Sequence, residues 1–195
     1  MRIVKSPRYE KWASSLRDRN VIARINARIL QIKHYGALTG DWKAVGDGVF
    51  ELRFHFGAGY RVYIALEGAA LLLLSLEARS RLKRRTLNSP RRSTSRGGVT
   101  MNSEWIEWDP SLDVNSSEDV AAFLNAVLEL GDPAILPDAL GVIARSRGMK
   151  AIAEETGLGR ESLYKSLSKS GNPRFSTVVN VLDCLGFRLQ VVPAA

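Results

Sequence analysis

The sequence predicts an α+β protein made of two modules. A helix-plus-antiparallel-sheet domain is expected over residues 1–76, and a flexible basic linker over 77–100. An all-α helix-turn-helix domain with a short C-terminal strand is expected over 101–195. Two observations predict this. The apolar residues change from helical to alternating spacing near Gly40 and return to helical spacing after residue 101. The charge changes as well: residues 1–100 carry 20 Lys+Arg against 7 Asp+Glu, whereas residues 101–195 carry 8 against 13.

The first module begins with a short strand, "RIVKS", and continues with a helical segment over residues 8–36. Apolar residues recur in this segment every three or four positions, as in Leu16, Ile22, Ile25, Ile29 and Ile32. The pattern breaks near residues 18–20 and ends at Gly36. The segment is therefore one helix or a helical hairpin.

Alternating residues in "VFELRFHF" and "YRVYIAL" predict two strands joined at "GAG", and "AALLLLSL" predicts a buried third strand. With Gly57–Gly59 as a three-residue loop, the expected cross-strand pairs are Phe56–Tyr60, His55–Arg61, Phe54–Val62 and Arg53–Tyr63. A bulge in the loop would shift this register. The register gathers four side chains on one polar face: Arg53, His55, Arg61 and Tyr63.

A histidine, two arginines and a tyrosine on one face suit the attack of an RNA 2′-hydroxyl on its own phosphate. The imidazole would exchange a proton, and the guanidinium groups would stabilise charge on the phosphoryl oxygens. The spacing alone favours the alternative, a solvated face with cross-strand charge pairs. Two scattered histidines without a cysteine or carboxylate cluster provide no metal ligand set, so we expect neither a metal nor a cofactor.

The block "GDWKAVGDGVFELRFHFGAGYRVY", together with "W...LRD....ARI.ARI", resembles the RelE/HigB superfamily of type II toxins, and most closely its addiction module killer proteins. The resemblance covers most of residues 1–74. It implies a RelE-like fold and metal-independent endoribonuclease activity on messenger RNA, often ribosome-bound. Lys43, Arg53 and Arg61 match recurrent basic positions of that family, with His55 and Tyr63 as supporting candidates. "LLLLSLEARSRLKRRT" departs from the "GGDK"-like ending of the family.

In the second module, "EDVAAFLNAVLELGDP" predicts a helix with Ser117 as its N-cap, and "PAILPDALGVIARSRG" a second helix. Ala153 and Gly157 within "MKAIAEETGLGRESLYKSLS" predict a helix-turn-helix over about residues 149–168, although a structural helical hairpin has the same pattern. The outward residues of its second helix would be Arg160, Glu161, Ser162 and Lys165. A last helix is expected from the N-cap Asn172, followed by the strand "FRLQVV". Cys184 is expected to be a core thiol.

Residues 132–191 resemble the HigA-type addiction module antidote proteins nearly throughout, including a lambda-repressor-like helix-turn-helix. The resemblance implies a homodimer, formed through the C-terminal half, that binds operator DNA, represses its own operon and neutralises a toxin. Gly159 stands where that family more often has serine. The acidic segment 101–119 contains Trp105, Ile106 and Trp108, our candidates for toxin contact. A solvated leader is the alternative.

The basic segment "RLKRRTLNSPRRSTSRGGVTM" lies between the two resemblances, and we interpret it as the result of a frameshift near residues 76–79 that joined neighbouring reading frames. The sequence has neither a signal peptide nor a run long enough to span a membrane, so we expect a cytoplasmic protein. Three functions remain open: a fused toxin–antitoxin, a DNA-binding repressor with an inactive toxin remnant, and a non-catalytic nucleic-acid-binding protein.

Overall fold

The structure is a computed structural model that describes residues 1–78, 104–191 and 193. The chain forms two compact units. The first contains Met1–Asp18 and Gln31–Trp108, and the second contains Arg19–Leu30 and Asp109–Ala195. Each unit therefore combines residues from both halves of the sequence. Most of the expected linker, from residue 79 on, lies outside the described residues.

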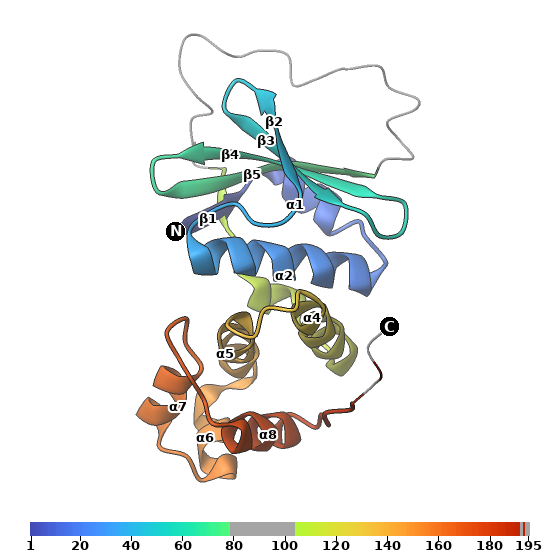
Figure 1. Ribbon diagram of the computed structural model, residues 1–195. Coiled ribbons are helices and arrows are strands. Elements are labelled where there is room, and N and C mark those ends of the chain that lie inside the picture. The colour runs from blue at the N-terminus through green and yellow to red at the C-terminus, as the bar shows by residue number, and fades with distance from the viewer. Residues whose placement is uncertain (79–103, 192, 194–195) are drawn as a thin grey trace. The chain divides into compact units, whose positions relative to one another are not determined.

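Among the described residues, the first unit is built on a six-stranded sheet in the order β2-β3-β4-β5-β1-β6. Figure 1 labels β1 to β5. The strands are β1 (Arg2–Lys5), β2 (Trp42–Gly46), β3 (Val49–Phe54), β4 (Tyr60–Glu67), β5 (Ala70–Ala78) and β6 (Ile106–Glu107). β1 runs parallel to β5, and the other neighbouring strands are antiparallel. The observed sheet is thus larger than the expected sheet of about three strands. The sequence pattern did not predict β2 and β6.

The interior of this sheet follows the apolar sequence pattern. The expected buried strand is confirmed as β5, where Leu71, Leu72 and Leu73 are fully buried. Leu52 of β3 and Val62 of β4 are also fully buried, because they alternate with polar residues along their strands. The expected break in the first helical segment is confirmed too, since α1 (Pro7–Ala13) and α2 (Arg19–Tyr35) are separate helices.

The predicted register of the β3–β4 hairpin is wrong by two residues. Phe54 pairs with Tyr60 instead of Val62, and Arg53 pairs with Arg61 instead of Tyr63. The loop contains five residues, 55–59, and is closed by a hydrogen bond from the Gly59 N–H to the Phe56 carbonyl of 2.9 Å. His55 consequently leaves the strand ladder, and Glu51 takes the place opposite Tyr63.

The second unit consists of helices. Besides the first part of α2 it contains η1 (Pro110–Asp113), α4 (Ser117–Glu129), α5 (Ile135–Arg147), α6 (Met149–Thr156), α7 (Arg160–Ser166) and α8 (Phe175–Cys184). Its apolar core includes Phe123, Ile135, Leu140, Leu163 and Val181, all at most 1% exposed. In the part of the chain that the structure describes, no helix combines the length and the apolar character needed to cross a membrane.

Three expectations about this unit are wrong. Ser116, not Ser117, is the N-cap of α4, because its hydroxyl and the Asp119 carboxylate form a reciprocal capping box. α8 begins at Phe175 rather than near Asn172. Residues 187–191 form no strand: the Phe187 N–H closes the end of α8 on the Leu182 carbonyl, with Gly186 at φ 83°, and the segment beyond is exposed.

Candidate functional site

A largely buried carboxylate, that of Glu51, connects the candidate catalytic residues of the sheet. Glu51 accepts hydrogen bonds from Arg53 Nε at 2.8 Å and from the Tyr63 hydroxyl at 3.1 Å. Arg61 Nε lies 3.3 Å from the same carboxylate oxygen that Arg53 contacts. The structure therefore brings Arg53, Arg61 and Tyr63 together, as expected, but around an acid. Glu51 was not among the candidates, although it occupies the polar side of the alternating pattern.

This acid determines the charge of the cluster. Burial and the neighbouring Glu51 carboxylate raise the pKa of Tyr63 to about 12, so its phenol stays protonated and donates near neutral pH. One carboxylate charge offsets one of the two guanidinium charges. The positive charge offered to a phosphate is thus smaller than two arginines alone would supply. Lys43 of β2 stands opposite Glu51 in the ladder and is exposed.

The structure does not place His55 in the strand ladder that carries this cluster. Its Nε2 lies 2.6 Å from Asp41 Oδ2, and two thirds of its side chain is exposed. The hydrogen bond with His55 is the main cause that lowers the pKa of Asp41. The imidazole is therefore held by a carboxylate, an arrangement that would orient a proton-exchanging histidine.

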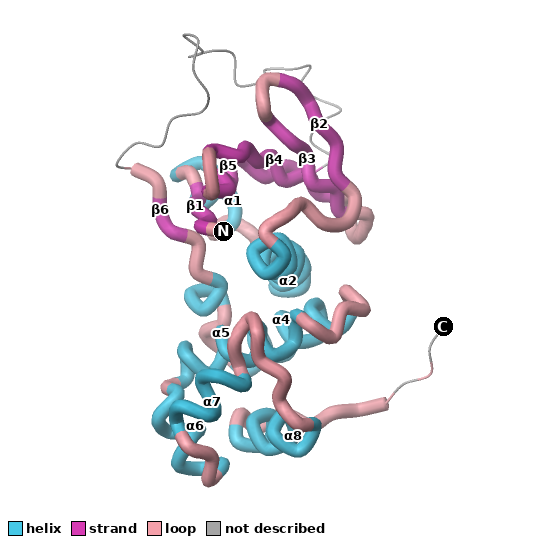
Figure 2. Tube along the Cα trace, turned by 60° about the vertical axis from the view of Figure 1, so that its left-hand side comes forward, coloured by secondary structure: helices cyan, strands magenta, loops and turns pink. Residues whose placement is uncertain are grey.

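The segment around β6 lies on the edge of the sheet (Figure 2). Ile106 pairs with Lys5 and Glu107 pairs with Val4, so this two-residue strand extends the sheet next to β1. Trp105 packs against a small apolar cluster that spans three strands: Val4, Ala65, Ala70 and Leu72. Since side chains alternate along β4, Ala65 lies on the same sheet face as Tyr63. Trp105 thus packs on the same sheet face as the Glu51 cluster, against a cluster of β1, β4 and β5 residues.

Trp108 is the most deeply buried of the three candidate contact residues. It is 2% exposed, and its backbone N–H donates to the Ile3 carbonyl at 3.0 Å. The Lys33 ammonium lies 5.7 Å from the centroid of its ring, within the range of a cation–π interaction. Ile106, by contrast, is 43% exposed. The two tryptophans, and not Ile106, therefore supply the apolar contact of this segment.

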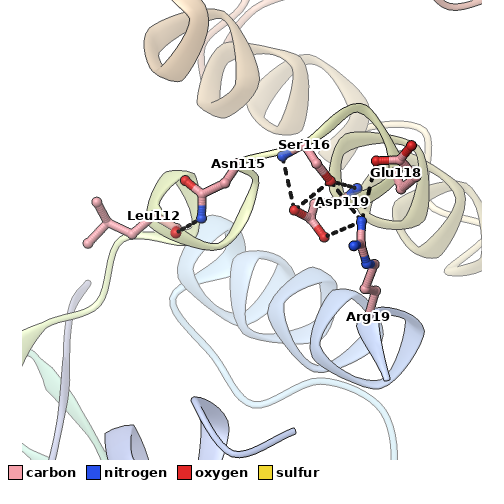
Figure 3. A network of polar contacts seen from close by, with 6 residues as sticks. All are labelled: Arg19, Leu112, Asn115, Ser116, Glu118 and Asp119. Atoms are coloured by element: carbon pink, nitrogen blue, oxygen red, sulfur yellow. Dashed lines mark hydrogen bonds and ion pairs between the residues drawn. The ribbon is translucent and has the colours of Figure 1, made fainter. Parts of the chain in front are cut away.

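Within the second unit, the start of α2 meets acidic residues near α4 and η1. Arg19 contacts the Ser116 hydroxyl at 2.8 Å and lies 3.4 Å from both Glu118 and Asp119 (Figure 3). Further along α2, Arg24 forms a two-point ion pair with Glu129 at 2.8 and 3.1 Å. The Asn26 amide donates to Asp113 at 2.8 Å. Basic and amide groups of the first half of the sequence are thus matched by acids of the second half.

The local hydrogen bonds favour the charged form of these acids. The pKa of Glu118 is lowered, chiefly by its own backbone N–H and then by the Ser116 hydroxyl. Burial acts to raise the pKa of Asp119, but the hydroxyl and backbone N–H of Ser116, together with the charge of Arg19, lower it overall. The helix N-terminus thereby holds two carboxylates ionised beside a guanidinium.

Two short helices, α6 and α7, occupy the residues over which a helix-turn-helix is expected. Gly157 ends α6 at φ 69°, a left-handed conformation that favours glycine, and Leu163 of α7 is fully buried. The four candidate DNA-contacting residues are all exposed: Arg160, Glu161, Ser162 and Lys165.

Cys184 is only half-buried, and its thiol donates to Glu155 at 3.2 Å. Burial and this acid raise the pKa of the thiol to about 11.

Comparison with known proteins assigns the C-terminal part of the chain. A family model described as "Probable addiction module antidote protein" matches residues 104–193. A protein of Haemophilus influenzae named "Uncharacterized protein" is 38% identical over 91 residues, which is 47% of this chain and 94% of the relative. A second protein with that name, from the same organism, is 42% identical over 66 residues, which is 34% of this chain and 65% of that protein. No solved structure gives a significant match. Through residues 104–193, the chain belongs to the family of probable addiction module antidote proteins.

Proposed function

We propose that this chain is a toxin–antitoxin fusion in which the antidote region holds a RelE/HigB-like toxin module silent. The observation that carries the proposal is the docking of residues 105–108 on the sheet of residues 1–78. β6 pairs with β1, Trp105 packs on the sheet face and Trp108 is buried. An added strand with apolar anchors is a common way to bind an exposed sheet edge. The matched region begins at residue 104, so this segment belongs to the antidote sequence.

The position of Trp105 gives the proposed silencing a physical basis. Trp105 packs against the cluster that contains Ala65, which lies two residues along β4 from Tyr63 and on the same face. A nucleic acid strand that approached Arg61 and Tyr63 from this side would meet the indole ring. The antidote segment would therefore restrict access to the proposed catalytic face without contacting the arginines themselves.

The C-terminal half is proposed to be a DNA-binding antitoxin and transcriptional autorepressor that acts as a homodimer. Support comes from the α6–α7 pair, whose second helix exposes Arg160 and Lys165 for contact with phosphates and base edges. Replacing both residues with alanine should abolish operator binding. Residual binding that falls steeply with salt would reflect non-specific contacts with the phosphates.

For the N-terminal half we propose a metal-independent endoribonuclease module that acts on messenger RNA, in which Arg53, Arg61 and Tyr63 contact the scissile phosphate. Lys43 and His55 are proposed as further members of this site. One observation favours a second function, a DNA-binding regulator with a non-catalytic toxin remnant. Glu51 already engages both arginines and the tyrosine, which lowers the attraction of the cluster for RNA.

Expression of residues 1–100 without the antidote region separates these two functions. Growth arrest with cleaved messenger RNA, lost on Arg61→Ala, is expected for a silenced ribonuclease. Unimpaired growth, with the fragment present and folded, would support the remnant and contradict the catalytic part of the proposal.

A further inference from the structure

The polar links between α2 and the α4–η1 region differ in kind from the apolar docking of Trp105 and Trp108. Each link joins a group on α2 to particular acceptors. Arg24 and Glu129 form two parallel hydrogen bonds, and Asn26, which is only 4% exposed, donates to Asp113. A buried amide needs a specific acceptor, and a two-point guanidinium–carboxylate pair fixes orientation as well as charge.

Two of these positions also share one face of the helix. Arg19 and Asn26 are seven residues apart, close to two turns of an α-helix. Arg24 starts from another side of the helix and reaches Glu129 with its long side chain. The acceptors come from η1, the N-terminus of α4 and its last turn: Asp113, Ser116, Glu118, Asp119 and Glu129. The donors on α2 and their acceptors are thus spread along the length of α2 and do not converge on a single point.

We propose that these links form a recognition surface by which the antidote region selects its toxin. It fits a toxin helix that carries arginine, arginine and asparagine at the spacing of Arg19, Arg24 and Asn26. The inference rests on the proposed toxin–antitoxin function and names the part of the toxin that is read. The tryptophans supply apolar area that many sheet edges would accept, whereas the polar links reject a helix with acidic or apolar residues at these positions.

The test substitutes the linked residues in the full chain, cuts the chain at a protease site inserted within residues 79–103, and measures the association of the two pieces. Arg24→Glu should weaken the association of the two pieces about tenfold, because an ion pair becomes a repulsive pair. Adding Glu129→Arg should restore it to within about threefold. Asn26→Asp should weaken the association as well, because a carboxylate then faces Asp113, and Asp113→Asn should restore it.

Arg17→Glu is the matched control, since exposed Arg17 undergoes the same charge change two residues before Arg19 in the sequence but takes no part in the three links. It should leave the association within about twofold of the unsubstituted chain. Failure of both compensating exchanges to restore association, or an equal loss for Arg17→Glu, overturns the recognition surface.

Failure of the proposed function gives a different result. If the cut chain without substitutions separates, the antidote does not hold the toxin module. The recognition surface is then tested by the coupling between Arg24 and Glu129 in urea unfolding of the uncut chain. A coupling indistinguishable from zero contradicts it, and a favourable coupling supports specific recognition between these residues.

Discussion

Removal of the Trp108 side chain should cost more stability than any other single change in the segment that docks on the sheet. The side chain is 2% exposed. A buried aromatic residue hides roughly 200 Å² of surface, worth about 5 kcal/mol at about 25 cal/mol per Å². Because alanine keeps part of this contact and the unfolded chain already buries some of the area, we expect Trp108→Ala to cost about 3–4 kcal/mol.

The assay is urea unfolding of the full chain followed by far-UV circular dichroism, which does not depend on the tryptophan that is removed. Trp42→Ala is the matched control, because Trp42 is 44% exposed on β2 and should lose about 1 kcal/mol or less. Trp105→Ala should fall between the two, since Trp105 is only partly buried. If Trp108→Ala is no more destabilising than Trp42→Ala, the docking of residues 105–108 does not contribute as argued.

Three further predictions concern other parts of the chain. Gly141→Ala should destabilise the helical unit by more than about 2 kcal/mol in thermal unfolding, because a Cβ at this position would lie 2.0 Å from the Leu167 carbonyl oxygen. A neutral effect would contradict this packing. The pKa of Asp119 is lowered in the folded chain, so its carboxylate stabilises the fold above the unfolded pKa near 3.8, and this contribution is lost as the pH falls further. Asp119→Asn should therefore flatten the acid side of a plot of Tm against pH. An unchanged slope would refute this. Glu51→Gln should lower the pKa of Tyr63 from about 12 toward 10.0, read as tyrosinate absorbance assigned with Tyr63→Phe; an unmoved transition would show that Glu51 does not act on Tyr63.

The sequence predicted elements whose signals are local. Gly157 and the apolar spacing around it predict the two short helices α6 and α7, because both the turn and the buried face depend on residues within about twenty positions. The alternating residues of β3 and β4 likewise identify the strands. The hairpin register was missed because it depends on the closure of loop 55–59 and on the pairing of His55 with Asp41, fourteen residues away.

Long-range partners explain the other differences. β6 has two residues and no alternating sequence pattern of its own. It is a strand because it pairs with β1, and the sequence does not show this pairing. Glu51 was visible on the polar face, but its role depends on which cross-strand residues it meets. The contacts of Arg19 and Arg24 join residues about a hundred positions apart, and the charge difference between the halves predicted their sign but not their identity.

The central claim, that the antidote region holds the N-terminal module, is tested most directly by cutting the chain between its two halves. After cleavage at a protease site inserted within residues 79–103, the two pieces should elute together in size-exclusion chromatography at micromolar concentration. The combined Trp105→Ala and Trp108→Ala chain should separate into two species after the same cut. Separation of the unsubstituted pieces would contradict the claim.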